Sequence, residues 1–336
     1  MNRPAPPETI SRLRGVLRVL AGGPTLFIHA KKTGRAEVES GRYGFFAALF
    51  ETCSEMDVPV AFMPHGRGPY LARLGLPSVH LYFTFGRRPA ARGVVFASPA
   101  YLNDYWYFDP KGHRSRSSVA DAVFDPADID PAEANAHFKR LRRRYVRGSE
   151  TSRHQDNQPP GALPESFIAI ALQHHKTEEE RAEAICSEIE LIDAVISARP
   201  DAPVVLKFHP AGARKETVDH VTRLAAENPR VHLSKANIHD VLDRARVLCC
   251  LNSAAGFEAM LHRTPAVLFA KSDFHHAAFT AADMDHVGEA LDAAEASNLN
   301  YPKYLYWFME RHMLHPDQPG CKARIRAVIE AALKRP

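Results

Sequence analysis

The sequence predicts an α/β protein of two domains, each built around a parallel sheet. Continuous apolar runs alternate with amphipathic runs along most of the chain, a pattern typical of parallel strands covered by helices on both faces. The 336 residues are enough for two cores of ordinary size. A polar stretch rich in Gly, Pro and Ser, residues 148–166, interrupts the alternation near the middle of the chain.

The first half of the chain contains four apolar runs that predict strands, at residues 24–30, 58–64, 80–85 and 93–99. Helical patterns occur at residues 43–56 and 131–147, and Pro131 suits the first turn of the second helix. We therefore expect a first Rossmann-like domain over residues 1–150 and an interdomain linker over residues 151–166.

The second half is more regular. Apolar runs predict strands at residues 167–173, 203–210, 231–235, 247–252 and 265–270. Amphipathic runs predict helices between and after them, at residues 178–198, 216–228, 238–245, 254–263 and from 303 onward. This order indicates a second Rossmann-like domain with terminal helices over residues 167–336.

The composition narrows the class of protein. With 45% hydrophobic and 24% charged residues the chain is of the soluble globular type, and no apolar run approaches the roughly 20 residues of a membrane span. The first residues lack the apolar region and cleavage site of a signal peptide. Five cysteines without a CxxC pair argue against a disulfide framework and a structural zinc site, so we expect a cytoplasmic protein. A net charge of +4 does not indicate a nucleic-acid partner.

Ligands of doubly wound sheets bind beyond the carboxyl ends of the strands. Lys207 and His209 lie at such an end and alternate onto one side of the strand, and Pro210 stops the ladder there. A lysine and a histidine at one strand end predict a phosphate site. The alternative is an ordinary solvated strand end.

A second strand end leads through Asn252 and Ser253 into a helix. Ser253 is placed to cap that helix, so its hydroxyl and the first free N–H groups form a natural anion site. Gly256 would let a ligand approach the backbone, and Glu258, one turn into the helix, could accept bonds from sugar hydroxyls. The alternative is that Ser253 only caps the helix and Glu258 is an exposed first-turn acid.

A third strand end carries Gln173, which is followed by two histidines. These residues could form a polar wall of the same pocket. Because no third ligand stands at a telling spacing from the histidine pair, we expect no metal site.

The motifs at these three strand ends resemble the capsule polysaccharide biosynthesis family. They are Leu172-Gln173, the KxHP motif from Lys207, and the block from Asn252 to Val267, and the resemblance extends over residues 167–313. Family members include β-Kdo glycosyltransferases of the GT-B fold that use CMP-Kdo. The HP and serine motifs are also similar to those of bacterial sialyltransferases.

The resemblance implies a GT-B-like fold, two Rossmann-like domains with parallel sheets facing a central cleft, and a metal-independent enzyme without a cofactor. It also implies roles for single residues. His209 and Ser253 would bind the CMP phosphate, with Lys207 and Asn252 beside them, and Glu258 would face the ribose. Donors so placed would stabilise charge on the departing CMP.

The chain departs from the family pattern at one functional position. The family's Kdo transferases carry an aspartate, the nucleophile of a retaining mechanism, shortly after the Leu-Gln pair. Here the stretch reads QHHKTEEE, and Glu178 is the carboxylate that could stand in. The stereochemical course and the sugar therefore stay open.

The first domain would bind the acceptor. Residues 97–118 combine aromatic residues with Asp109 and His113, either of which could act as the base that activates an acceptor hydroxyl. The alternative is an aromatic packing segment that ends in a DPxG turn. His65 and Gly66 follow another strand and carry weaker support.

A basic run, Lys139 to Arg147, suggests a peripheral contact with the inner face of the membrane or with an anionic glycolipid. The alternative is a solvated helix face. The reading as a whole is a cytoplasmic glycosyltransferase that transfers Kdo or a similar keto sugar acid from CMP to a capsule or other surface polysaccharide or glycolipid. The open alternatives are a GT-B relative that uses a UDP- or GDP-sugar, as a transferase or an epimerase, and a non-catalytic anion-binding scaffold of polysaccharide assembly.

Overall fold

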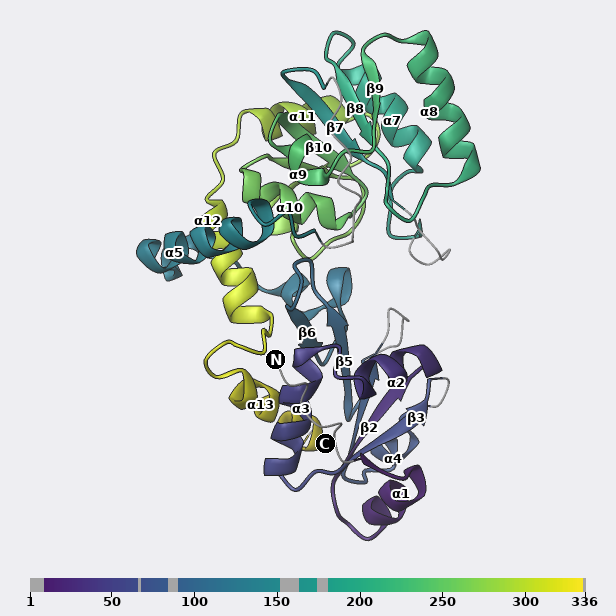
Figure 1. The fold of residues 1–336 in the computed structure, drawn as a ribbon, viewed down its shortest axis with the longest axis vertical. Helices are drawn as coiled ribbons and strands as arrows, with labels where there is room; N and C mark the ends of the chain where they lie inside the picture. Colours follow the sequence, from purple (N-terminus) through teal and green to yellow (C-terminus); the bar gives the residue numbers. More distant parts are fainter. Residues whose placement is uncertain (1–8, 66–67, 84–89, 152–162, 174–180, 335–336) are drawn as a thin grey trace. The chain divides into compact units, whose positions relative to one another are not determined.

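The computed structural model describes residues 9–65, 68–83, 90–151, 163–173 and 181–334 (Figure 1). The chain forms two compact units. The first unit comprises Met1–Ala100, Asp104–Ala122 and Phe308–Pro336, and the second comprises Tyr101–Asn103 and Val123–Trp307. The two α/β units agree with the predicted class.

The first unit is built on a six-stranded sheet in the order β1-β3-β2-β4-β5-β6. The first five strands in this order are parallel and β6 is antiparallel to β5. Their bounds are β1 (Thr9–Ile10), β2 (Thr25–Ala30), β3 (Val60–Pro64), β4 (Ser78–Phe83), β5 (Val94–Pro99) and β6 (Trp106–Asp109). The sheet carries α1 (Arg12–Leu20), α2 (Lys32–Glu39), α3 (Gly44–Glu55), α4 (Tyr70–Arg73) and α13 (Cys321–Lys334). Short 3-10 turns follow β6 at Arg114–Arg116 and Ser118–Asp121.

The boundaries of the two units differ from the expected ones near the middle of the chain and in its last residues. We expected the helix at 131–147 in the first domain and the last helix in the second. Instead α13 belongs to the first unit, where Ile325 and Ile329 are fully buried in one cluster with Phe45 and Leu49 of α3. The helix expected at 131–147, which the structure forms as α5 (Pro131–Leu141), belongs to the second unit because it packs against α12 (Tyr301–Tyr306). Sequence order cannot show which sheet a terminal helix covers, since both sheets offer apolar faces.

The second unit also contains a six-stranded sheet, and all its strands are parallel, in the order β12-β11-β10-β7-β8-β9. The strands are β7 (Phe167–Ala171), β8 (Val204–Lys207), β9 (Val231–Ser234), β10 (Ala245–Cys250), β11 (Ala266–Leu268) and β12 (Phe279–Thr280). Every residue of β7 and β8 is buried, which explains why both read as continuous apolar runs.

The second unit also contains helices, of which the first and the last in the chain pack against each other (Figure 1). They are α5 (Pro131–Leu141), α7 (Glu188–Ala198), α8 (Lys215–Glu227), α9 (Ile238–Leu242), α10 (Ala254–His262), α11 (Val287–Glu295) and α12. A π-helical turn, Arg142–Val146, continues α5, and another, Trp307–His312, continues α12. Short 3-10 turns occur at Pro126–Asp128 and His275–Ala277.

Two elements differ from the prediction. Of the helix expected over residues 178–198, residues 178–180 lie outside the described part of the chain, and residues 182–187 are not helical. Helix α7 begins at Glu188, where Ser187 and Glu190 form a capping box, in which each side chain bonds the other residue's backbone N–H. The aromatic segment over residues 97–118, for which the sequence predicted no strand beyond residue 99, contains β6, which is buried throughout and pairs with β5 at the edge of the first sheet. No helix within the described ranges is both long and apolar enough to cross a membrane.

Candidate functional site

Three adjacent strands of the second sheet end in the residues singled out from the sequence. Gln173 follows β7, Lys207 ends β8 with His209 just beyond it, and Asn252 follows β10. Because β7 lies between β8 and β10 and all three run parallel, their carboxyl ends lie side by side at one edge of the sheet. The structure therefore brings these residues together.

This edge is where the strand order reverses. From β7 the chain proceeds outward through β8 and β9, then returns to place β10 on the other side of β7. Adjacent connections leave such a point in opposite directions, so their loops separate and form a ligand crevice. Gln173 and Asn252 belong to the two strands that flank this point.

The side chains of Gln173 and Asn252 are held together. Gln173 Nε2 donates to Asn252 Oδ1 at 3.1 Å, and the backbone N–H of Asn252 donates to Gln173 Oε1 at 2.8 Å. Asn252 Nδ2 donates in turn to the carbonyl of Lys271 at 3.1 Å. The amide pair thus closes the end of the β7–β10 pair and fixes the orientation of both side chains.

Lys207 and Glu258 form the buried charged part of the edge. Lys207 is 5% exposed, and its Nζ donates to the carbonyl of Phe208 at 2.9 Å. Burial lowers the pKa of Lys207, and the negative charge of Glu258 opposes that shift. Glu258 is itself only 2% exposed. The alternative that Glu258 is an exposed first-turn acid is therefore wrong, and this carboxylate helps to keep a buried lysine charged.

His209 is half-buried just beyond β8. Its Nδ1 accepts a hydrogen bond from the backbone N–H of Ala211 at 3.0 Å. When the ring is neutral, the proton must therefore lie on Nε2. This tautomer makes Nε2 a donor, as binding of an oxyanion requires.

Ser253 caps α10, as predicted. Its Oγ accepts from the backbone N–H of Ala255 at 3.2 Å, and its backbone is extended, as is usual for this position. The cap engages the hydroxyl as an acceptor, so the hydroxyl proton remains available to a second acceptor. Capping and anion binding are thus compatible at this helix end.

Gly256 has a packing role that the sequence did not reveal. A Cβ placed there would lie 3.1 Å from a ring carbon of Phe274 and 3.2 Å from Cys250 Sγ. The glycine is buried beneath these two side chains. Its small size therefore lets α10 approach Phe274 and β10 closely. Contact with a ligand stays a prediction.

Glu188, at the first turn of α7, was missed from the sequence. It is largely buried, and its carboxylate accepts from the backbone N–H of Gln173 and from Thr217 Oγ1, the latter at 3.4 Å. Burial raises the pKa of Glu188, and these two bonds together with the charge of Arg214 oppose the rise. The capping box at Ser187 was the available signal, since it places Glu188 at a helix start on this edge.

In the first unit, Asp109 and His113 lie away from the carboxyl ends of the parallel strands. Asp109 ends the antiparallel strand β6 and pairs with Phe96 near the start of β5. Its carboxylate is 8% exposed and accepts from Lys111 N, Gly112 N, Ser118 N and Ser118 Oγ at 2.7 to 3.1 Å. These contacts favour the alternative of a turn residue. His113 lies in the turn that these bonds hold, with its ring 6.4 Å from Tyr107.

Two of the residues singled out from the sequence lie outside the described part of the chain, Glu178 and Gly66. His65 directly follows β3, at the carboxyl edge of the first sheet. Among the described residues, no three His, Cys, Asp or Glu side chains are grouped so as to hold a metal ion. Metal independence stays a prediction.

The comparisons with known proteins concern both the family and the fold. Residues 139–295 match the family model described as capsule polysaccharide biosynthesis protein. No curated protein sequence matches the chain. The matched residues include the whole candidate edge, from Gln173 to Glu258.

Solved structures share the arrangement at low sequence identity. The KpsC beta Kdo 2,7 transferase of Thermosulfurimonas dismutans is 12% identical with a TM-score of 0.56, over 93% of this chain and 100% of that one. The KpsC beta Kdo 2,4 transferase of that organism is 11% identical with a TM-score of 0.53, over 84% and 88%. The family match and these two folds agree with the motifs at the sheet edge. Residues 139–295 are thus similar to the capsule polysaccharide biosynthesis family, and the chain has a GT-B-like α/β fold.

Proposed function

We propose that the protein is a glycosyltransferase that transfers Kdo or a similar keto sugar acid from a CMP-activated donor to a capsule or other surface polysaccharide or glycolipid. One observation carries the proposal. The edge at the switch point of the second sheet combines a buried lysine, a histidine with Nε2 as donor, and a serine-capped helix start. The two solved structures of similar fold are Kdo transferases by name, which supports this choice of sugar.

In this proposal, different residues of the sheet edge bind different parts of the donor. His209 Nε2–H and the Ser253 hydroxyl bind the phosphate of CMP, and the charge of Lys207 stabilises it as the sugar departs. Asn252 and Gln173 hold the wall of the pocket through their mutual hydrogen bonds. Gly256 lies under the pocket, and Glu258 faces the ribose while it keeps Lys207 charged.

The remaining parts of the proposal concern the catalytic residues, the cofactor requirement and the location in the cell. Glu178 is the proposed catalytic carboxylate, and Asp109 or His113 the acceptor base, with Asp109 the weaker choice because its oxygens already accept four hydrogen bonds. Neither a metal nor a cofactor takes part. The enzyme acts in the cytoplasm and makes peripheral membrane contact through Lys139–Arg147.

Calorimetric titration with CMP, UDP and GDP tests the donor site. We expect selective binding of CMP, and we expect His209→Ala to weaken it at least about tenfold, since a hydrogen bond to a charged group contributes about 1.5–3 kcal/mol. His232→Ala, on neighbouring β9, is the matched control and should bind as the wild type does. Preferential binding of UDP or GDP would indicate the alternative donor, and no binding of any nucleotide would refute the phosphate site.

Transfer from CMP-Kdo to candidate acceptors tests the chemistry. Glu178→Gln should abolish transfer without loss of CMP binding. Transfer that survives both Glu178→Gln and His113→Ala would remove these two residues from catalysis. A wild-type protein that binds CMP but transfers no sugar to any acceptor would favour the non-catalytic scaffold.

A further inference from the structure

The basic run of α5 and its π-helical turn lines a cavity of about 560 Å³ in the second unit. Arg263, at the end of α10, closes it from another element. Six of the eight lining residues are cationic and none is acidic: Lys139, Arg140, Arg142, Arg143, Arg147 and Arg263. The sequence suggested a membrane or glycolipid contact, or a solvated helix face, and the structure forms a concave site here.

The π-helical turn keeps the cations in line. In an α-helix of 3.6 residues per turn, residues four apart drift steadily around the axis. Between Arg142 and Val146 the turn is wider, and Arg147 N donates to the carbonyl of Arg142 at 3.0 Å, a bond across five residues. The wider turn reduces the drift, so Lys139, Arg143 and Arg147 all reach the same cavity.

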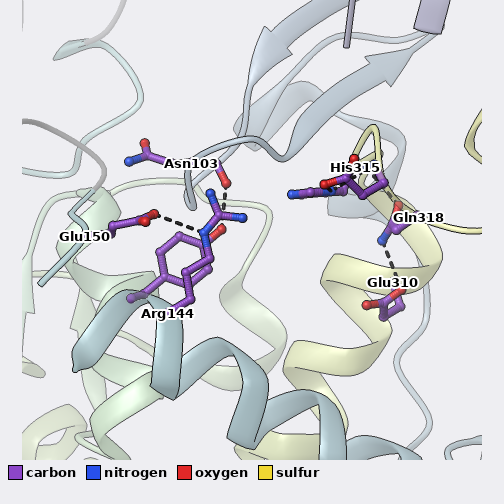
Figure 2. Close-up of polar contacts among 8 residues, drawn as sticks. Asn103, Arg144, Glu150, Glu310, His315 and Gln318 are labelled. Carbon is purple, nitrogen blue, oxygen red and sulfur yellow. Dashed lines mark hydrogen bonds and ion pairs between the residues drawn. The ribbon is translucent and has the colours of Figure 1, made fainter. Parts of the chain in front are cut away.

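Within the described part of the chain, the charges of the cavity are not neutralised. Among the residues that the structure describes, none of the six cations has a carboxylate oxygen within 4.0 Å. Arg144 of the same run, which does not line the cavity, is paired with Glu150 at 3.1 Å (Figure 2). The run therefore pairs an arginine outside the cavity and leaves the six inside it to repel one another, a cost that a bound anion would offset.

Phe138 orients two of the guanidinium groups. Arg263 Cζ lies 4.9 Å and Arg142 Cζ 5.9 Å from the centroid of its ring. A guanidinium over a ring keeps its N–H edge turned outward, where it can bind an oxyanion with two parallel bonds. Arg263 also has a φ of 62°, in the left-handed region that glycine usually occupies at a helix end. The left-handed region is unfavourable for a residue with a side chain, so the presence of an arginine there points to a use for its guanidinium group.

The cavity is separate from the candidate donor edge. Ser253 caps the start of α10 and Arg263 follows its end. The nine residues of this helix span about 14 Å, so the two sites lie at opposite ends of one element.

We propose that this cavity is a second anion site, which binds a ligand with two or more phosphate charges. Several arginine forks around one cavity match phosphate groups in geometry and in charge. The phosphates belong either to a lipid headgroup or to a free phosphate compound. The site does not depend on the proposed transfer reaction or on the nucleotide of the donor.

The test compares a double variant, Arg143→Ala with Arg147→Ala, with a control that removes the same charge elsewhere in the second unit, Arg223→Ala with Arg230→Ala. One arm is calorimetric titration of the full chain with inorganic pyrophosphate. The other is flotation with vesicles that contain cardiolipin, whose headgroup carries two phosphates, against vesicles of phosphatidylcholine alone. Circular dichroism and thermal melting establish that each variant is folded. A conservative double variant, Arg143→Lys with Arg147→Lys, keeps the positive charges and removes only the guanidinium groups that can form two parallel hydrogen bonds.

We expect the double variant to weaken binding at least about tenfold in one arm, with the control within about twofold of the wild type. Loss in the pyrophosphate arm identifies a free phosphate compound, and loss in the vesicle arm alone identifies a lipid headgroup. An affinity of the double lysine variant between those of the wild type and the double alanine variant supports two-bond contacts from the arginines to the phosphate. Equal loss in the control variant, or no loss in either arm, would overturn the proposal.

Discussion

His29 and His80 lie side by side on neighbouring strands of the first sheet, and both are fully buried. His29 Nε2 and His80 Nδ1 are 2.9 Å apart, so one of these two atoms carries a proton and the other accepts it. His80 Nε2 lies 3.2 Å from Ser78 Oγ. The hydrogen bonds hold the His80 ring in the core, where burial disfavours its charged form.

The pH dependence of folding follows from that constraint. Burial lowers the pKa of His80 from 6.5 to about 4, so the unfolded chain takes up the proton at a higher pH than the folded one. The stabilising contribution is therefore complete above pH 6.5 and is lost as the pH falls toward 4. Between pH 7.5 and pH 5 we expect a loss of about 2 kcal/mol in the free energy of unfolding.

Urea unfolding at the two pH values measures this loss. The chain has two tryptophans, Trp106 in the first unit and Trp307 in the second, so Trp307→Phe leaves a fluorescence probe of the first unit. In that background, His80→Gln should reduce the pH dependence by about the same 2 kcal/mol, because an amide bonds without titrating. His232→Gln in the second unit is the control, and an unchanged slope in His80→Gln would refute this explanation.

At the scale of elements, the contact of α10 with its surroundings depends on the absence of one side chain. Gly256→Ala would press a methyl group against Phe274 and Cys250, which are themselves packed in the core. We expect the free energy of unfolding to fall by about 1–3 kcal/mol, the usual cost of overpacking. Gly288→Ala in α11 is the matched control, since a Cβ there meets no described atom within 4 Å.

Comparison of the two variants separates the effect of overpacking on the free energy of unfolding from the effect of backbone entropy. Both changes remove the freedom of a helical glycine, which stabilises by about 0.4–1 kcal/mol when space allows. Gly288→Ala should therefore be neutral or slightly stabilising in chemical denaturation. If Gly256→Ala were as stable as Gly288→Ala, the close approach of α10 to Phe274 would not limit this position.

At the scale of the whole molecule, the chain ends by returning to the unit in which it began. Ile325 of α13 is fully buried in the first core, whereas Ile192 of α7 is fully buried in the second. Ile325→Ala should lower the free energy of unfolding of the first unit by about 2–5 kcal/mol, because it leaves a cavity in that core. The first 122 residues therefore do not contain a complete core.

The two tryptophans can assign this loss to a unit. Ile325→Ala should shift the urea transition reported by Trp106 in the Trp307→Phe background, and Ile192→Ala should leave that transition in place. The reciprocal background, Trp106→Phe, should show the opposite pattern through Trp307. Equal shifts of both probes by Ile325→Ala would mean that the units unfold as one.

Much of the fold could be predicted because parallel strands buried on both faces have a strong sequence pattern. β7, β8 and β10 are mostly apolar, and the polar residues at or just beyond their carboxyl ends marked Gln173, Lys207 and Asn252 as neighbours. Ser253 was predicted as a cap from local chemistry alone. In each case residues close in the sequence were sufficient evidence.

The sequence by itself determined the α/β class, most strand positions, the residues at the sheet edge and the resemblance of residues 139–295 to the family. The tertiary structure decided which sheet α13 covers, that Asp109 holds a turn on β6, and that Glu188 bonds Gln173. It also formed a cavity from the basic run and the distant Arg263. These features join residues far apart in the chain or depend on how a strand is oriented. Local periodicity carries no information on such contacts, because they arise only when the elements pack.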